Sequence, residues 1–363
     1  MNSAVFTDRR SAGHPSLADL GWRTELESDF GPYAATCVPG RVARVDRGLC
    51  DVLVADTSGT RTIRADWSAI SDRDPVRNPC TGDWVAVDLD TQNQPVVKAL
   101  LPRRTAVVRG GVGERSDGQV LAANIDHVVI TVSLAAKPDM ARIERLLALA
   151  WESGGRPVIV MTKADVAYEP ERLAEVEAAA PGATVLAVSA LTGDGMDVLS
   201  AVLAGSSAAL IGQSGVGKST LTNALVGTEV MATGDTRDVD EKGRHTTTTR
   251  ELISLPGGGV LIDTPGLRSV GLFGGESGLA QTFSDIEELA EDCRFADCAH
   301  VSEPGCAVLA AIVGGSLPER RLESYRKLLR ENEWIASRTD ARRGAERKKV
   351  WKQRERASNA ARP

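Results

Sequence analysis

The sequence has no uninterrupted apolar stretch that approaches the roughly 18 residues needed to span a membrane as a helix. Its N-terminus carries Asp8, Arg9 and Arg10 with no apolar run behind them, so no secretory signal peptide is visible. These absences predict a cytoplasmic protein with no membrane partner. The 363 residues, 42% hydrophobic and 25% charged, are typical of a globular protein. At roughly 150 residues per domain, this length predicts two or three domains.

Cysteine is also scarce, and its placement argues against disulfides. Three of the six cysteines are scattered, as small buried apolar residues usually are in a reducing compartment; they are Cys37, Cys50 and Cys80. The other three lie close to one histidine, and three cysteines cannot pair off among themselves. This cluster of Cys293, Cys298, His300 and Cys306 indicates a metal site.

The cluster supplies three thiolates and one imidazole within 14 residues. Four soft ligands suit tetrahedral Zn²⁺, and a complete set of four leaves no position open for catalysis. We therefore expect one structural zinc ion that stabilises a small helical domain. The alternative is a group of ordinary buried cysteines beside a loop histidine.

The formal net charge of −6 is unevenly distributed along the chain. From Arg320 to Pro363 there are 15 Lys/Arg and 6 Asp/Glu, whereas the rest of the chain has 28 and 43. An acidic body with a basic tail is typical of proteins that bind polyanions at one place. From charge alone, a solvated charged helix is the alternative.

The N-terminal part reads as a polar segment followed by a β-rich domain. Residues 1–35 are polar and punctuated by Gly and Pro, and we expect a flexible leader there. Residues 36–105 contain short β-type runs separated by turn residues such as Ser58-Gly59. Such runs predict a small barrel, with an oligonucleotide-binding (OB) fold as first choice and an SH3-like barrel as the alternative. The strands expected are Val42–Val45, Asp51–Ala55, Arg61–Ala65 and Trp84–Asp88.

From residue 106 to 275, apolar strands alternate with helical stretches, which argues for a parallel sheet covered on both faces. The strands expected are His127–Val132, Pro157–Met161, Ala183–Val188, Ala208–Ile211 and Gly259–Ile262. The helices expected are Met140–Trp151, Glu169–Ala180 and Thr220–Val226. We expect a helical zinc-binding domain at 276–340 and a basic tail at 341–363, which makes the fold class multidomain α/β.

The segment Gly212–Ser219 reads GQSGVGKS and matches the complete phosphate-binding-loop pattern. An apolar strand precedes it and a helical stretch follows, which is the context that the pattern requires. Gly212 and Gly217 allow the backbone to aim successive N–H groups at phosphates, and the helix N-terminus adds partial positive charge. Lys218 is expected to neutralise the terminal phosphates, and the hydroxyl of Ser219 is expected to bind Mg²⁺. The nucleotide contacts expected in this segment are Gly212, Gln213, Ser214, Gly215, Val216, Gly217, Lys218, Ser219 and Thr220.

Two further loops at strand ends predict guanine as the base. The first, Thr162-Lys163-Ala164-Asp165, differs by one residue from the guanine motif NKxD. The carboxylate of Asp165 can accept two hydrogen bonds from guanine, whereas adenine lacks that pair of donors. Thr162 stands where Asn is usual and loses the amide that would brace the loop. The second, Ser189-Ala190-Leu191, is expected to offer a backbone N–H to the base.

The segment Asp263-Thr264-Pro265-Gly266 closes another apolar strand and resembles the DxxG motif of GTPases. Asp263 is expected to hold Mg²⁺ through water, and Gly266 to offer its N–H to the γ-phosphate. Leu267 follows where many small GTPases have the glutamine that orients the attacking water. Catalysis therefore needs another group, or the intrinsic rate is low.

His245, within the GRHTTTT segment of residues 243–249, is the candidate catalytic residue. A neutral imidazole has an acceptor nitrogen that can orient or deprotonate water. One threonine of the segment is expected to bind Mg²⁺ when the γ-phosphate is present. The alternatives are a solvent-exposed loop histidine, and Arg244 acting as an arginine finger in cis.

The motifs occur in a permuted order. Base recognition comes first along the chain, then the phosphate-binding loop, the threonine-rich segment and finally DTPG, whereas ordinary GTPases begin with the phosphate-binding loop. Permutation keeps the core because the termini of a compact α/β domain lie at its surface. After Gly266 the chain leads directly into the C-terminal domain, so a movement that depends on the γ-phosphate could reposition that domain.

With these motifs assembled, the chain resembles the RsgA (YjeQ) family of circularly permuted GTPases over about residues 36–333. The resemblance rests on the GRHTTTT segment, the cysteine–histidine spacing, Thr81-Gly82-Asp83-Trp84-Val85 and Ala123-Asn124-Ile125-Asp126. It implies an OB barrel, a permuted G domain and a zinc domain. In the family, the histidine matching His245 is the proposed catalytic residue, and the threonine matching Thr247 is the Mg²⁺-binding switch threonine.

The resemblance also implies slow GTP hydrolysis that the small ribosomal subunit stimulates, and a role in late subunit maturation. The implied partners are the small ribosomal subunit, its ribosomal RNA and other assembly factors, and we expect a monomer. A different class of protein, an RNA-binding scaffold that holds GTP without useful turnover, is the alternative that Leu267 favours. A P-loop ATPase or kinase is a third hypothesis.

Overall fold

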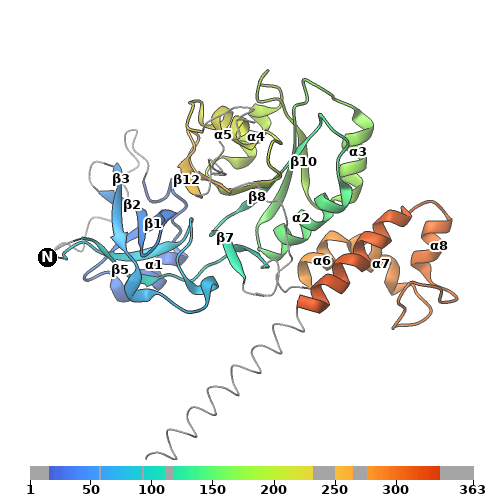
Figure 1. Cartoon of the computed structure of the whole chain (residues 1–363), viewed down its shortest axis with the longest axis horizontal. Coiled ribbons are helices and arrows are strands. Elements are labelled where there is room, and N and C mark those ends of the chain that lie inside the picture. The colour runs from blue at the N-terminus through green and yellow to red at the C-terminus, as the bar shows by residue number, and fades with distance from the viewer. Residues whose placement is uncertain are drawn as a thin grey trace, which may run out of the picture.

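The computed structural model shows a barrel and a helical group on opposite sides of an α/β domain (Figure 1). The residues described are 16–56, 59–91, 94–110, 118–231, 250–264 and 276–335.

Five strands close into the barrel in the order β1-β2-β3-β5-β4. Neighbouring strands are antiparallel except β3 and β5, which pair in parallel at Asp66 and Val96. Alternate residues along each strand face inward, as Cys50, Val52 and Val54 do on β2. This strand order is that of an OB fold, so the OB prediction is confirmed over the SH3-like alternative. The elements are β1 (Val38–Val45), β2 (Leu49–Asp56), β3 (Gly59–Asp66), β4 (Trp84–Asp88) and β5 (Val96–Leu100), with 3₁₀ turns η2 (Ser68–Ile70) and η3 (Pro75–Arg77).

The N-terminal segment packs on the barrel, so the prediction of a flexible leader is wrong for residues 16–35. This segment forms α1 (Glu25–Phe30) and the 3₁₀ turn η1 (Gly31–Tyr33). Leu20 is buried, and the ring of Trp22 meets Trp84 of β4 edge-on, with 4.9 Å between centroids. The apolar residues that anchor the segment are too widely spaced among polar ones to stand out in the sequence. Residues 1–15 lie outside the described part of the chain.

A fully buried arginine, Arg41 of β1, joins the N-terminal segment, the barrel and the α/β domain. Its guanidinium donates to the carbonyl oxygens of Leu20, Gly82 and Asn124, the last at 2.9 Å, and to Ser207 Oγ at 2.8 Å. Burial lowers the pKa of Arg41 to about 9, which means that the fold is less favourable for the charge than water is. The hydrogen bonds offset that cost only when the N-terminal segment, the barrel and the α/β domain are docked together.

The α/β domain contains a six-stranded sheet in the order β10-β9-β8-β11-β13-β12. All neighbours are parallel except β12 and β13. All five predicted strands are present, and a short ribbon of β6 and β7 links the sheet to the barrel. The strands are β6 (Ala106–Arg109), β7 (Gln119–Ala123), β8 (His127–Ser133), β9 (Arg156–Thr162), β10 (Thr184–Ala187), β11 (Ser207–Gly212), β12 (Glu251–Ser254) and β13 (Val260–Asp263).

Helices cover both faces of the sheet, as the apolar strand runs predicted. Val128 and Ile130 of β8 share one hydrophobic cluster with Leu147 of α2, whereas Val129 shares another with Leu221 of α5. Successive strand residues thus point to opposite, equally buried layers, which is why these strands are apolar throughout. The helices are α2 (Met140–Glu152), α3 (Pro170–Ala179), α4 (Met196–Leu203) and α5 (Lys218–Val226).

The C-terminal helical group packs against α2 (Figure 1). Gly278 lies so close to α2 that a Cβ atom there would be 2.3 Å from the carbonyl oxygen of Ala148. The last described helix spans 319–335 and lies across the group. The others are α6 (Ser277–Thr282), α7 (Ser284–Glu291) and α8 (Ala307–Val313).

A buried arginine also holds this group in place. Arg321 lies between Glu144 of α2 and Asp285 of α7, at 3.1 Å and 2.8 Å from their carboxylate oxygens. Its guanidinium also donates to the carbonyl oxygens of Ala179 and Thr282. Both Arg321 and Glu144 are buried, and separating such a pair leaves an uncompensated charge. The helical group is therefore docked on the α/β domain by specific contacts.

Candidate functional site

The phosphate-binding loop connects β11 to α5, as predicted. Gly212 lies against β8, where a Cβ atom would be 2.2 Å from Thr131 Oγ1, so only glycine fits. Gly217 has a φ of 95°, which favours glycine immediately before the first residue of α5. That residue, Lys218, is nearly buried, and its Nζ donates to the carbonyl oxygens of Gly212 (3.2 Å) and Gln213 (2.9 Å). The loop thus wraps around the lysine ammonium at a helix N-terminus, which is an arrangement that binds phosphate.

An acidic residue lies at the end of the neighbouring strand. Asp263 ends β13, and the next residue is fixed because Thr264 Oγ1 donates to the carbonyl oxygen of Leu210 at 2.7 Å. Burial raises the pKa of Asp263 to about 6, and it lowers the pKa of Lys218. Asp263 Oδ1 is buried and has no hydrogen-bond partner in the described part of the chain. A buried, unpaired carboxylate oxygen beside a phosphate loop fits a hard cation such as Mg²⁺.

The base-recognition loop contacts the phosphate-binding loop through its threonine. Thr162, at the end of β9, donates from Oγ1 to the carbonyl oxygen of Val216 at 2.6 Å. Lys163 has a φ of 62°, and its Nζ donates to the carbonyl oxygen of Gly215 at 3.3 Å. The hydroxyl of Thr162 therefore braces the two loops although the usual amide is missing, a role that the sequence did not predict.

The second base loop positions the carboxylate of the first. Ser189 is buried and donates from Oγ to Asp165 Oδ1 at 2.6 Å. The same Oγ accepts the N–H groups of Leu191 and Thr192. The N–H of Ala164 donates to the carbonyl oxygen of Val188 at 3.1 Å, which joins the loops by their backbones. Three segments that are far apart along the chain thus meet at the carboxyl ends of β9, β10 and β11, where α/β folds bind ligands.

Several predicted site residues lie outside the described residues. They are His245 and Thr247 of the GRHTTTT segment, Gly266 of DTPG, and the neighbouring Arg244 and Leu267.

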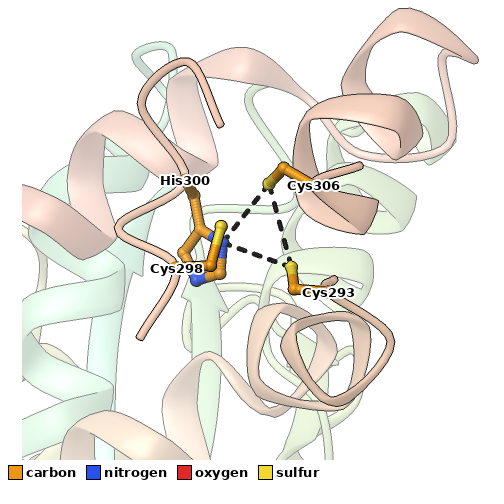
Figure 2. A group of neighbouring side chains, drawn as sticks. All are labelled: Cys293, Cys298, His300 and Cys306. Carbon is orange, nitrogen blue, oxygen red and sulfur yellow. Dashed lines mark hydrogen bonds between the residues drawn. The ribbon is translucent and has the colours of Figure 1, made fainter. Parts of the chain in front are cut away.

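The cysteine–histidine cluster forms a second site, in the C-terminal helical group (Figure 2). The four ligand atoms of Cys293, Cys298, His300 and Cys306 lie within 4.8 Å of one another. Cys306 Sγ is 3.4 Å from His300 Nδ1, and Cys293 Sγ is 3.8 Å from Cys306 Sγ. For metal–sulfur bonds of about 2.3 Å, a tetrahedron has edges of about 3.8 Å, so the spacing fits a tetrahedral metal ion.

The backbone around the cluster is arranged to present these atoms. Cys306 is the N-cap of α8. His300 has a φ of 57°, and its turn is stabilised by Glu303, whose carboxylate accepts the N–H groups of Ala299, Val301 and Ser302. The N–H of Glu303 itself, together with these N–H groups, lowers the pKa of its carboxyl to about 2. The sequence predicted the ligands but not this supporting carboxylate.

The barrel, the permuted sheet and the loops at its edge define a circularly permuted P-loop GTPase with an OB barrel and a cysteine–histidine cluster that could hold a metal ion. A family model described as "RsgA GTPase" matches residues 100–273. Over 96% of its length the chain is 58% identical to "Small ribosomal subunit biogenesis GTPase RsgA" of Streptomyces coelicolor, 96% of which is covered. It is 56% identical to the protein of that name from Streptomyces avermitilis, over 97% of this chain and 95% of that one. The chain belongs to the RsgA family of GTPases.

Solved structures share this fold. YjeQ from Thermotoga maritima matches 82% of this chain and 98% of its own, with a TM-score of 0.59 and 26% identity. YloQ, described as a circularly permuted GTPase, matches 82% of this chain and 95% of its own, with a TM-score of 0.55 and 24% identity. Among the described residues, no helix is long and apolar enough to cross a membrane.

Replacing Asp263 by asparagine is expected to stabilise the nucleotide-free protein while weakening its Mg²⁺-dependent nucleotide binding. The pKa of Asp263 is about 6 in the folded protein and 3.8 in the unfolded chain. Above pH 6 the buried ionised carboxylate therefore lowers the free energy of unfolding by up to about 3 kcal/mol. The cost is absent below pH 3.8 and grows as pH rises through 6, so the stabilisation should be largest at pH 7 to 8 and shrink toward pH 5.

Thermal unfolding at several pH values measures the first effect, and affinity for fluorescent GDP with Mg²⁺ or with chelator measures the second. The exposed carboxylate of Asp29 provides the control, because an Asp29→Asn variant should change neither. Equal unfolding midpoints for Asp263→Asn and wild-type protein at pH 7.5 would contradict the burial argument.

Proposed function

We propose that this GTPase docks on the small ribosomal subunit, acts in its late maturation, and hydrolyses GTP faster when docked. The observation that carries the proposal is the convergence of three loops on one nucleotide site in a chain that also has an OB barrel, a fold that often binds oligonucleotides. The names of the two Streptomyces relatives support the choice of partner. Because ribosomal subunits mature in the cytoplasm, we place the protein there. We also expect it to act as a monomer.

We assign the nucleotide contacts as the sequence predicted them. Asp165, oriented by Ser189, accepts the two guanine donors, and Lys218 with the N–H groups of its loop binds the phosphates. Ser219, Thr247 and Asp263 would hold Mg²⁺, which when bound neutralises phosphate charge during transfer. Gly266 would offer its N–H to the γ-phosphate. His245 would orient the attacking water, since a leucine at 267 cannot.

We assign zinc to the cluster of three cysteines and one histidine, because soft ligands at tetrahedral spacing favour that ion. The proposed domains are the barrel at 36–105, the G domain at 106–275, the zinc domain at 276–340 and the basic tail at 341–363. The barrel and the tail would contact ribosomal RNA, the tail through its excess of Lys and Arg. Other assembly factors would be released when GTP is hydrolysed.

Phosphate release from GTP, measured with and without purified small ribosomal subunits, tests the proposal. We expect a slow rate of phosphate release from the protein alone and a rate that rises with subunit concentration. In a separate competition experiment, GDP should displace bound GTP and ATP should not. Turnover that subunits leave unchanged would favour an RNA-binding scaffold, and displacement by ATP would favour an ATPase.

A His245→Ala variant is expected to lower the subunit-stimulated rate by about a hundredfold while leaving GTP affinity unchanged, as loss of a group that orients or deprotonates water does. Single-turnover hydrolysis and fluorescent-nucleotide titration separate the two quantities. The matched control is Arg244→Ala, which tests the neighbouring residue of the same segment. A variant at 245 that hydrolyses GTP normally, beside a slow variant at 244, would transfer the role to the arginine.

A further inference from the structure

One loop of the barrel reaches the nucleotide-binding sheet. We call residues 80–83, which precede β4, the junction loop. Asp83 fixes its shape: the buried carboxylate accepts the N–H of Cys80 at 2.7 Å and pairs with Arg103 at 2.7 Å. A loop held in this way moves with the barrel as a unit.

The junction loop packs directly on β7 and β13. Gly82 has a φ of 94°, and a Cβ atom there would lie 2.3 Å from the carbonyl oxygen of Ala123 and 2.7 Å from Ile262 Cδ1. The N–H of Ala123 donates to the carbonyl oxygen of Thr81 at 3.1 Å. Ile262 immediately precedes Asp263, so the barrel touches the residue beside the carboxylate of the nucleotide site.

The same loop contacts the residue that enters β12. Arg250 is the first described residue after 232–249, the stretch whose sequence includes the GRHTTTT segment. Its carbonyl oxygen accepts from Thr81 Oγ1 at 3.4 Å, and its Nη1 donates to the carbonyl oxygen of Val120 in β7 at 3.2 Å. The next residue, Glu251, pairs with Asp263 across the β12–β13 ladder.

The side chain of Arg250 is half-buried and has no carboxylate partner among the described residues. Its Nε is buried and has no hydrogen-bond acceptor in the described part of the chain. Burial lowers the pKa of Arg250, and the nearby guanidinium of Arg109 acts in the same direction. The guanidinium is held by packing and by the carbonyl oxygen of Val120, so its position depends on where β7 lies.

We propose that Arg250 is a positioning residue through which docking on the barrel is communicated to GTP hydrolysis. The junction loop contacts the sheet one residue before Asp263 through Gly82, and at the entry to β12 through Thr81. A bound subunit that displaces the barrel therefore shifts Ile262 of β13 and Arg250 at the entry to β12 together. Where docking changes the affinity for GTP relative to GDP, linkage requires the bound nucleotide to act on the barrel in return. This inference rests on the proposed function, because docking on the subunit is its input.

The test compares Arg250→Ala, Arg250→Lys and Thr81→Val with wild-type protein in the phosphate-release assay. Arg250→Ala should keep the basal rate, GDP affinity and subunit affinity, but lower the ratio of stimulated to basal rate about fivefold or more. Thr81→Val should lower it less, and the lysine variant, which keeps a donor for Val120, should recover part of it. The control is Arg104→Ala, which removes a half-exposed ion pair to Asp126 at the same junction and should behave as wild type.

A second measurement works without subunits and separates failure of this inference from failure of the proposed function. Amide hydrogen exchange at residues 80–83 should differ between the GDP complex and a non-hydrolysable GTP-analogue complex in wild-type protein, and should not differ in Arg250→Ala. If subunits fail to stimulate the wild-type enzyme, the proposed function fails, and the exchange difference still decides the coupling. An unchanged stimulation ratio in Arg250→Ala, or equal loss of basal and stimulated rates, overturns the positioning role.

Discussion

An Asp165→Asn variant should lose about a hundredfold in GTP affinity and acquire measurable affinity for xanthosine triphosphate. The carboxylate of Asp165 is oriented by the hydroxyl of Ser189, which donates at 2.6 Å to Oδ1. A carboxylate accepts from both the ring N–H and the amine of guanine, whereas a carboxamide offers one acceptor and one donor, which matches xanthine. Losing one charge-assisted hydrogen bond and meeting one mismatched donor costs about 3 kcal/mol, which corresponds to about a hundredfold.

Displacement of fluorescent GDP by GTP, xanthosine triphosphate and ATP measures this change. The matched control is Asp194→Asn. It alters an exposed carboxylate in the loop that follows Ser189, and this carboxylate accepts a hydrogen bond from Thr192 Oγ1. The control should keep the wild-type order of affinities. If Asp165→Asn bound GTP as tightly as the wild-type protein does, the base would be recognised elsewhere.

A Cys306→Ser variant should lose the metal ion proposed for the cluster and the structure of residues 293–313. Serine can still cap α8, as Cys306 does, and has nearly the same size, so the substitution removes chiefly the thiolate ligand. Structural zinc sites contribute on the order of 10 kcal/mol to folding, far more than a short segment gains from its own core. The remaining cysteines would then hold the ion only weakly.

Metal content by mass spectrometry should fall from one zinc ion per chain to well below one, and limited proteolysis should cut within 293–313. Cys37→Ser provides the control, because this buried cysteine lies outside the cluster. A variant at 306 that retained stoichiometric zinc and resisted protease would show that the cluster does not depend on all four ligands. A metal other than zinc in the wild-type protein would refute the assignment of the ion.

The strands, the phosphate-binding loop and the cysteine–histidine cluster could be predicted because each rests on local sequence. Short β-type runs separated by turn residues, such as Asp51–Ala55, predicted the barrel, and apolar runs predicted buried parallel strands. The wrap of the loop around Lys218 follows from glycines at fixed spacing. These features depend on neighbours along the chain, which the sequence lists in order.

Contacts between residues far apart in the sequence could not be predicted. Arg321 and Glu144 are 177 positions apart, and Arg41 and Ser207 are 166 apart, so nothing local indicates that these charged or polar groups are buried. The same holds for Arg250 and Val120, and for the bond between Thr162 and Val216 that replaces the usual brace. Buried polar residues look like surface residues until the fold supplies their partners.

The two buried arginines have a mechanical consequence. Arg41 fixes the barrel to one side of the G domain, and Arg321 fixes the helical group to the other (Figure 1). Both arginines limit how far the barrel and the helical group can move relative to the G domain, so the two outer surfaces lie at a spacing that varies little. A partner whose two contact points match that spacing gains the second contact at high effective concentration, whereas one with altered spacing gains only the first. Partners can therefore be distinguished by the spacing of their contact points, with no sequence-specific contact at the barrel or at the helical group.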